Sequence, residues 1–373
     1  MLFCNFDEYE NTLDLIRDLC RIPAPSGHEY ERAKYCLDFF KNLGIKNAYI
    51  DDCNNAICVL GPDNAETVLF SAHTDTVFPD MVPLPYSEDE ENIYCPGVGD
   101  DTACLAIMMS CVKFLVESKL EFKRRVIFAA NSCEEGLGNL KGMRKIFRDF
   151  PDIVRMYTFD GMYDAVVDKS VGSHRYKLTV KTQGGHSFND FGNRNAIAVL
   201  ADIIGKIYCI EVPKNGDSKT TYNVGTIEGG TSVNTIAQQC SCFVEYRSDD
   251  VDCLGEMQRK FHEIFESAKG MCKELEVELV GERPCSDGVD RAEQKSLTEK
   301  VAMIQKKYAG VEVSVNSGST DCNIPHSLGI PAACVGVHKG GGMHTRQEWS
   351  KKESLKAGLC IALDLIYGEG LGG

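Results

Sequence analysis

Histidine, aspartate and glutamate side chains follow several apolar runs of this sequence at the points where the runs end. They are His73 and Asp75 after the first run, Glu134 and Glu135 after the second, Asp160 after the third, and His344 beyond the last, at the end of a glycine-rich loop. Imidazole and carboxylate groups are ligands for zinc, cobalt and manganese, and a carboxylate outside the coordination shell can act as a general base. Gathered at one place, these side chains could hold two cations and activate a water molecule.

Each apolar run is typical of a short, buried strand. The runs cover residues 56–60, 67–72, 125–130, 154–159 and 332–337, and turn-forming residues bound them. Helical patterns lie between them, notably at residues 102–117 and 140–148, so strands and helices alternate as in an α/β layer with a largely parallel sheet. In an open sheet of this kind, ligands bind beyond the carboxyl ends of the strands. We therefore expect the polar groups to converge on one crevice.

Each polar motif alone has an ordinary structural explanation. A histidine two residues from an aspartate occurs by chance in many proteins, and Glu134-Glu135 could be solvated surface. Asp100-Asp101 could cap the start of a helix. These explanations fail together, because separate strands would each have to leave polar groups at the same end of a buried sheet. Like charges so close together require cations, which favours a metal cluster.

The pattern changes at about residue 172, where long strands of alternating polar and apolar residues begin. From there to residue 286 the elements follow in the order strand, helix, strand, strand, helix, strand, which predicts a compact α+β insertion. Beyond residue 287 the earlier alternation of helices and strands resumes. We therefore expect two domains: a discontinuous α/β domain at residues 1–171 and 287–373, and an inserted domain at residues 172–286.

The composition excludes several classes of protein. The 373 residues include 40 Lys and Arg against 55 Asp and Glu, and the net charge of −15 repels nucleic acid and anionic membrane surfaces. We therefore expect neither as a partner. Acidic residues near the first methionine and the lack of a long apolar run predict a cytoplasmic protein without a signal peptide or membrane span. The 18 cysteines are scattered with no Cys-x-x-Cys pair, which indicates reduced thiols.

Five segments together resemble peptidase T and its relatives. They are SAHTDTV at residues 71–77, PGVGDDTACLA at 96–106, NSCEEGLG at 131–138, YTFDG at 157–161 and GMHTRQEW at 342–349. These relatives are dinuclear zinc hydrolases that also include aminoacylases, glutamate carboxypeptidase and the acetylornithine and succinyl-diaminopimelate deacylases. Motif order and spacing match over essentially the whole chain. The resemblance implies an α/β/α zinc-peptidase-like catalytic domain with an inserted α+β lid, two divalent metal ions, and hydrolysis of an amide bond.

The resemblance also implies a role for each polar residue at the strand ends. Asp100 would bridge the two metal ions, with His73 and Asp160 completing one site and Glu135 and His344 the other. Zinc is the expected metal, with cobalt or manganese as alternatives. Glu134 would then be the general base, and Asp75 would orient the ring of the first histidine.

The bridging position departs from the family in one respect. A lysine, or Met-Lys, usually follows the bridging aspartate, whereas this chain has Asp101-Thr102. The Asp-Asp-Lys variant of the family indicates that the first acid is still the ligand. The resemblance further implies a cis peptide bond between Asp100 and Asp101.

Three residues of the inserted domain are further candidates. Taken alone, His186 in a glycine turn and Arg247 at a strand end would be ordinary surface residues. The resemblance implies instead that His186 contacts the developing oxyanion, often from the neighbouring subunit, which predicts a homodimer formed through the lid. It implies substrate contacts for Asn234 and Arg247, because a planar guanidinium can bind the carboxylate of a small peptide.

The expected activity is that of a peptidase T-like aminopeptidase acting on di- or tripeptides. Asp160 is the residue type found in the aminopeptidases of the family, whereas deacylases and carboxypeptidases, the alternative, tend to have Glu. A non-catalytic relative would have lost a ligand or the base, and none is lost here. A nucleotide-binding α/β protein would need a glycine-rich loop, but Gly97-Val98-Gly99 leads straight into two acids, which repel phosphate.

Overall fold

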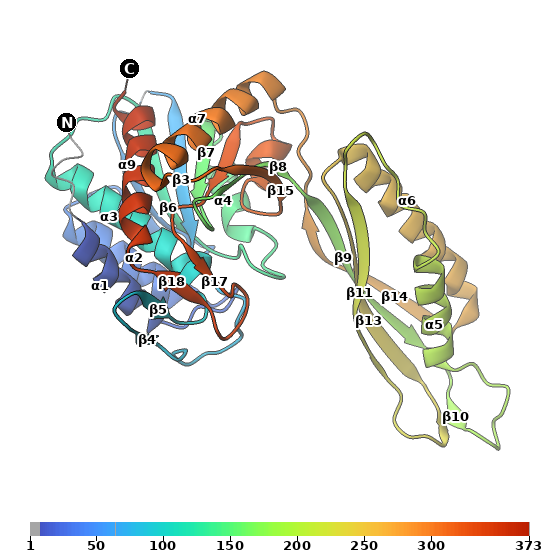
Figure 1. Cartoon of the computed structure of the whole chain (residues 1–373). Coiled ribbons are helices and arrows are strands. Elements are labelled where there is room, and N and C mark those ends of the chain that lie inside the picture. Colours follow the sequence, from blue (N-terminus) through green and yellow to red (C-terminus); the bar gives the residue numbers. More distant parts are fainter. Residues whose placement is uncertain (1–7, 64, 373) are drawn as a thin grey trace. The chain divides into compact units, whose positions relative to one another are not determined.

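The computed structural model describes residues 8–63 and 65–372, which form two compact units (Figure 1). The first unit contains the chain up to Ser170 and from Asp287 onward, and the second, called the lid below, contains Val171–Ser286. These limits lie within one residue of the boundaries expected from the change in sequence pattern. No helix in the described part of the chain is long and apolar enough to cross a membrane.

An eight-stranded sheet forms the centre of the first unit. Its strand order is β1-β2-β6-β3-β7-β16-β8-β15. The strands are β1 (Ala48–Ile50), β2 (Ala56–Leu60), β3 (Thr67–His73), β6 (Arg125–Asn131), β7 (Ile153–Phe159), β8 (Ala165–Ser170), β15 (Ser314–Gly318) and β16 (Ala332–Val335). Strands β6, β3, β7 and β16 run parallel to one another, so their carboxyl ends share one edge of the sheet.

Alternating residues of the central strands face two separate cores. Phe70 of β3 and Phe128 of β6 belong to one core, whereas their neighbours Leu69 and Ile127 belong to the other. The first core is covered by α1 (Tyr9–Cys20), α2 (Tyr30–Asn42), α3 (Ala103–Glu117), α7 (Arg291–Ala309) and α9 (Ser354–Gly370), and the second by α4 (Lys141–Asp149) and α8 (Asn323–Ser327). The unit is therefore the expected three-layer α/β/α arrangement, with helices on both faces of a mainly parallel sheet.

A cluster of stacked aromatic rings fixes the central strands against one another. Phe70 stacks on Phe128, Tyr157 and Phe159 at centroid distances of 5.8, 5.2 and 5.8 Å, and all four side chains are fully buried. Burial of each such side chain contributes roughly 1.5–3 kcal/mol to folding. Because Phe159 immediately precedes Asp160, this packing also sets the position at which that carboxylate leaves the sheet.

Three parts of the first unit differ from the sequence-based expectation. Strands β8 and β15, the last two at one side of the sheet, were not predicted, because they are partly exposed and carry polar residues. The three-residue strand β1 at the opposite edge was not predicted either. A second, small sheet of β4 (Ser87–Glu88), β5 (Asn92–Tyr94), β18 (Trp349–Lys351) and β17 (Gly340–Gly341) was also missed, since strands this short show no periodicity. The small sheet pairs the chain that leads to Asp100 with the chain that follows His344.

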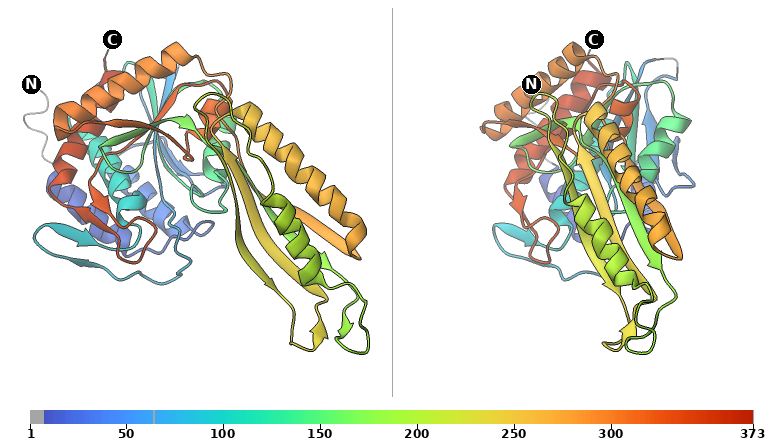
Figure 2. Two further views of the ribbon diagram at one scale, coloured as in Figure 1. Left: turned by 45° about the vertical axis from the view of Figure 1, so that its right-hand side comes forward. Right: turned by 90° about the vertical axis from the view of Figure 1, so that its right-hand side faces the viewer.

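The lid is an antiparallel sheet with two helices on one face (Figure 2). Its strand order is β11 (Thr220–Gly229), β13 (Gln239–Ser248), β9 (Gly172–Lys181) and β14 (Glu274–Arg283), and the helices are α5 (Ala196–Ile207) and α6 (Val251–Ala268). Leu178 and Val244 face the helices, whereas their neighbours Lys177 and Glu245 lie on the solvated face. The order of elements is the expected one, with the short strands β10 (Gly185–His186) and β12 (Thr235–Ile236) added at one end.

Candidate metal centre

The carboxyl ends of β3, β6 and β7 carry the polar groups singled out from the sequence. β3 ends at His73, which is paired in register with Asn131, the last residue of β6. Asp160 follows the end of β7, and Glu134 and Glu135 follow β6 by a short turn. The histidine and both glutamates are buried, and the aspartate is half-buried. The topology therefore brings residues that are far apart in the sequence to one edge of the sheet.

The Asp100 carboxylate lies between two histidine rings. Its Oδ1 is 2.9 Å from Nε2 of His73, and its Oδ2 is 3.0 Å from Nε2 of His344. Asp100 lies on an irregular helical turn, Val98–Thr102, that leads into α3, and the Asp100–Asp101 peptide bond is cis, as expected. One carboxylate thus offers each of its oxygens to a different imidazole, as a ligand shared by two cations would.

Glu135 supplies a second carboxylate to the same cluster. Its Oε1 is 3.2 Å from Nε2 of His344. Ligand atoms of His73, Asp100 and Glu135 all lie within 4.8 Å of one another. Glu135 is therefore a candidate ligand, and the role of the adjacent Glu134 stays a prediction.

Asp101 is a member of the cluster to which the sequence pattern assigned no role. Its side chain is buried, and its Oδ2 accepts a hydrogen bond from the backbone N–H of His73 at 3.0 Å. Ligand atoms of His73, Asp101 and Asp160 lie within 4.8 Å of one another. Asp101 is thus a further candidate ligand beside Asp160. Its place next to the expected bridging residue was the one local signal that could have identified it.

The buried carboxylate of Asp75 holds the loop that carries both glutamates. Its Oδ1 accepts a hydrogen bond from the backbone N–H of Glu134 at 3.0 Å, and its Oδ2 accepts one from that of Glu135 at 2.9 Å. The hydroxyl of Ser26 donates to the same Oδ2 at 2.6 Å. Nδ1 of His73 lies 3.0 Å from the backbone oxygen of Asp75 and 3.4 Å from its Oδ1. The backbone of Asp75, more than its carboxylate, therefore orients the ring so that Nε2 faces the cluster.

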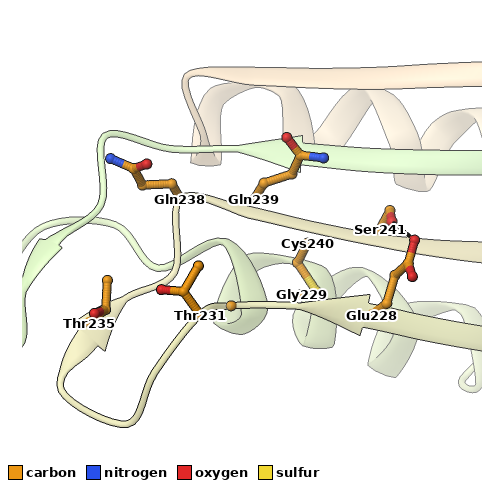
Figure 3. Close-up of a pocket in the computed structure, with 9 residues that line it drawn as sticks. Glu228, Gly229, Thr231, Thr235, Gln238, Gln239, Cys240 and Ser241 are labelled. Carbon is orange, nitrogen blue, oxygen red and sulfur yellow. Dashed lines mark hydrogen bonds between the residues drawn. The ribbon is translucent and has the colours of Figure 1, made fainter.

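Two of the three lid candidates lie together at one end of the lid sheet. Nδ1 of His186 accepts hydrogen bonds from two backbone N–H groups at 3.3 and 3.4 Å. Asn234 lies beside it, and its backbone oxygen accepts a hydrogen bond from Ser187 at 3.0 Å. Both side chains are exposed. A cavity of about 370 Å³ opens at the same end of β11 and β13, with Thr231 and Thr235 in its lining (Figure 3).

Arg247 lies at the other end of β13. Its Nε and Nη2 donate to the two carboxylate oxygens of Glu245 at 2.8 and 3.0 Å. The eight steps along β13 from Gln239 to Arg247 span about 26 Å at 3.3 Å per residue. A single lid therefore cannot bring Arg247 and Asn234 to the same small peptide, and the expectation that both contact one substrate does not hold within one chain.

The sequence matches a known protein family over well more than half of its length. The model of Peptidase family M20/M25/M40 matches residues 69–367. The chain belongs to this family. It is therefore an M20 hydrolase, and the expected resemblance to peptidase T and its relatives is confirmed at the level of the family.

Known proteins share the sequence or the fold of this M20 chain over large parts of its length. An uncharacterized protein of Bacillus subtilis is 25% identical over 365 residues, which cover 92% of this chain and 94% of that protein. Succinyl-diaminopimelate desuccinylase of Corynebacterium glutamicum is 27% identical over 248 residues, 61% of this chain and 66% of the enzyme. The structure of aminopeptidase PepT from Bacillus cereus matches with a TM-score of 0.71 at 24% identity, covering 95% of this chain and 97% of that chain. The last comparison shows a shared fold.

Burial, repulsion between carboxylates and contacts with histidines all shift pKa values in this M20 centre. Burial raises the pKa of Asp160 to about 7, and the nearby Asp100 adds to the rise. Burial likewise raises the pKa of Asp101 well above its usual value. Contacts with Asp100 and Glu135 raise the pKa of His344 to about 10. The centre thus holds more carboxyl groups than its two histidines could neutralise if all were ionised.

The donor atoms of the centre fit divalent cations. Around a tetrahedral zinc ion with ligand distances of roughly 2.0–2.1 Å, neighbouring donor atoms lie about 3.4 Å apart. The imidazole–carboxylate distances here are 2.9, 3.0 and 3.2 Å. Oε1 of Glu135 is buried, and its contact with Nε2 of His344 at 3.2 Å lacks the geometry of a full hydrogen bond. Imidazoles and carboxylates with this spacing and this excess of negative charge suit zinc, cobalt or manganese.

Asp75→Asn tests the role of the Asp75 carboxylate. The amide can accept a hydrogen bond from only one of the two glutamate N–H groups and turns its own N–H toward the other. A buried N–H without an acceptor costs roughly 1–3 kcal/mol, so we expect the free energy of unfolding of the metal-free protein, measured in urea, to fall by about that amount. Asp38→Asn, which removes only a surface ion pair with Lys34, is the control. Equal stabilities of the two variants would contradict this role.

Proposed function

We propose that the chain is a two-metal aminopeptidase that removes the amino-terminal residue of di- or tripeptides. The observation that carries this proposal is the Asp100 carboxylate, which offers one oxygen to His73 and the other to His344. Enzymes of the M20 family depend on two metal ions. The position of Asp100 is that expected of a ligand common to both ions.

Five side chains would hold the two ions. His73 and Asp160, whose ligand atoms group with those of Asp101, would bind one ion together with Asp100. Glu135 and His344 would bind the other ion with the second oxygen of Asp100. When bound, the cations would lower the pKa of a water molecule and polarise the carbonyl group of the scissile bond. Zinc suits this set of nitrogen and oxygen donors, and cobalt and manganese suit it as well.

Glu134 is the proposed general base. Its backbone N–H donates to the carboxylate of Asp75, and the residue is buried. Because Glu135 supplies the oxygen that groups with the ligands, Glu134 is the glutamate left for proton transfer. A carboxylate in that position can take a proton from the attacking water and deliver it to the leaving amine.

Residues of the lid are proposed to contact the substrate from two copies of the chain. His186 and Asn234 share one end of the lid, and Arg247 lies at the other end of β13. In a homodimer formed through the lid, one lid would supply His186 and Asn234 while the other supplies Arg247. The guanidinium of Arg247, already oriented by Glu245, would bind the carboxylate of the peptide.

Deacylation of an N-acyl amino acid is the second candidate reaction. The Corynebacterium glutamicum relative is a desuccinylase, and the same centre could attack either kind of amide bond. The aspartate at position 160 favours the aminopeptidase, since the deacylases of the family tend to have glutamate there. The two reactions differ in whether the substrate carries a free amino group.

The number of bound metal ions tests the proposed ligands. The reconstituted protein should hold two divalent ions, and His344→Ala should hold one. Loss of a hydrogen-bond partner behind a metal ligand lowers metal affinity by roughly 10- to 100-fold. Loss of the ligand itself should lower the affinity for the second ion by more than that. Metal content after exhaustive dialysis, measured by mass spectrometry, gives the count. His28→Ala, an exposed histidine outside the cluster, is the control. Two tightly bound ions, or full activity, in His344→Ala would contradict the assignment.

Glu134→Gln should keep both ions and lose catalysis. The amide has nearly the same size as the carboxylate but cannot accept the proton of the water, so kcat should fall by about 100- to 10,000-fold. Metal content and kcat measured on the same preparation separate the two effects. Glu117→Gln, at the exposed end of α3, is the matched control and should behave as wild type. Retention of metal by Glu135→Gln together with its loss from Glu134→Gln would mean that base and ligand are exchanged.

A panel of matched substrates decides between the two reactions. Free di- and tripeptides should be cleaved at the amino end, and N-acetylation of the same peptides should lower kcat/KM sharply. Arg247→Ala should raise KM by about 10- to 100-fold, the equivalent of one charge-assisted hydrogen bond, with a smaller effect on kcat. Arg259→Ala on the exposed face of α6 is the control. Products are identified by mass spectrometry, and preference for the acylated compounds would replace the aminopeptidase with a deacylase.

A further inference from the structure

The carboxylate of Glu348 binds the backbone of the turn that carries Asp100. Its Oε2 accepts a hydrogen bond from the N–H of Gly97 at 2.7 Å, and its Oε1 accepts from the N–H groups of Gly99 and Asp100 at 2.8 and 2.9 Å. The residue is 1% exposed. It is neither a proposed metal ligand nor part of the proposed proton transfer. Three backbone donors directed at one buried carboxylate therefore need another explanation.

The turn closes tightly around this carboxylate. A Cβ atom added to Gly99 would lie 3.1 Å from Oε1 of Glu348 and 2.8 Å from Cε1 of His338. Gly97 has a φ of 78°, in the left-handed region that favours glycine. Hydrogen bonds from backbone N–H groups to a carboxylate are about twice as strong as those between neutral groups. Glu348 thus fixes the course of the backbone immediately before the side chain of Asp100.

Glu348 also belongs to the segment that carries His344. It follows His344 by four residues, and its own backbone oxygen accepts a hydrogen bond from the N–H of Cys95 at 3.2 Å. The adjacent strand β18 pairs with β5, which precedes the turn. One residue therefore connects the loop of His344 to the chain that leads into Asp100.

We propose that Glu348 is a positioning residue that sets the carboxylate of Asp100 between His73 and His344. This inference rests on the proposed two-metal function. His73 is buried and tied to the end of β3, whereas the side chain of His344 is 57% exposed and lies on a loop. The affinity for the ion that Asp100 and His344 would bind should therefore depend strongly on Glu348. The affinity for the ion beside His73 should depend on it less.

Glu348→Gln tests the proposal. The amide keeps the size of the side chain but turns an N–H group toward at least one of the three backbone donors. Titration of the metal-free protein with cobalt(II), followed by calorimetry and by the visible d–d absorption spectrum, gives the affinity and the geometry of each bound ion. We expect the first ion to bind as in wild type and the second about 10- to 100-fold more weakly, with an altered spectrum, a lower kcat and an unchanged KM.

Two further variants complete the experiment. Glu353→Gln, 70% exposed on the same C-terminal segment, is the matched control and should titrate as wild type. Glu348→Asp keeps the charge on a shorter side chain, should give an intermediate second affinity, and carries the test if the glutamine variant does not fold. Wild-type affinities and spectrum in the folded Glu348 variant would overturn the proposal, even with a lower melting temperature. Fewer than two ions in the wild-type protein would overturn the proposed function itself.

Discussion

Six acidic residues lie at one edge of a parallel sheet, and the cost of placing so many carboxyl groups close together is the constraint on which the first unit depends. They are Asp75, Asp100, Asp101, Glu134, Glu135 and Asp160. A buried charge without compensation costs several kcal/mol, so each group needs hydrogen-bond donors, a proton or a cation. Asp75 takes two backbone N–H groups and a hydroxyl, Asp100 takes two imidazoles, and the pKa of Asp160 rises to about 7. The backbone at this edge is accordingly folded to present donors to carboxylates.

The sequence predicts the strands that position the centre because their signal is local. β2, β3, β6 and β7 are continuous apolar runs, since helices bury both faces of the sheet, and their ends fall within a residue of the predicted ones. A polar residue directly after such a run is equally local, which is why His73 and Asp160 could be identified. β8 and β15 could not, because the half-exposed edge of the sheet accepts polar residues such as Asp168 and Asn316.

The groups that hold the proposed ligands in place could not be predicted, because they come from distant parts of the chain. Glu348 lies 248 residues from Asp100, and Ser26 lies 49 residues from Asp75. In the sequence, either would pass for an ordinary residue of a surface loop, and only the folded chain shows which backbone N–H or carboxylate it meets. The separation of Arg247 from Asn234, by contrast, could have been predicted. The length of the predicted strand between them already implies that they lie far apart.

The charge of the centre also bears on the choice between the two proposed reactions. Bound cations favour the ionised form of nearby carboxyl groups, and six ionised carboxylates outnumber the four positive charges of two divalent cations. A peptide with a free amino terminus brings a positive charge into this field, whereas an N-acyl amino acid brings only its negative carboxylate. At 4 Å and an effective dielectric constant of about 20, one pair of unit charges interacts by roughly 4 kcal/mol, more than the roughly 1–3 kcal/mol by which a pocket discriminates one methylene group. The repulsion that favours cations at the proposed centre would therefore also favour an ammonium group on the substrate, so that charge would separate the two proposed reactions more than pocket shape.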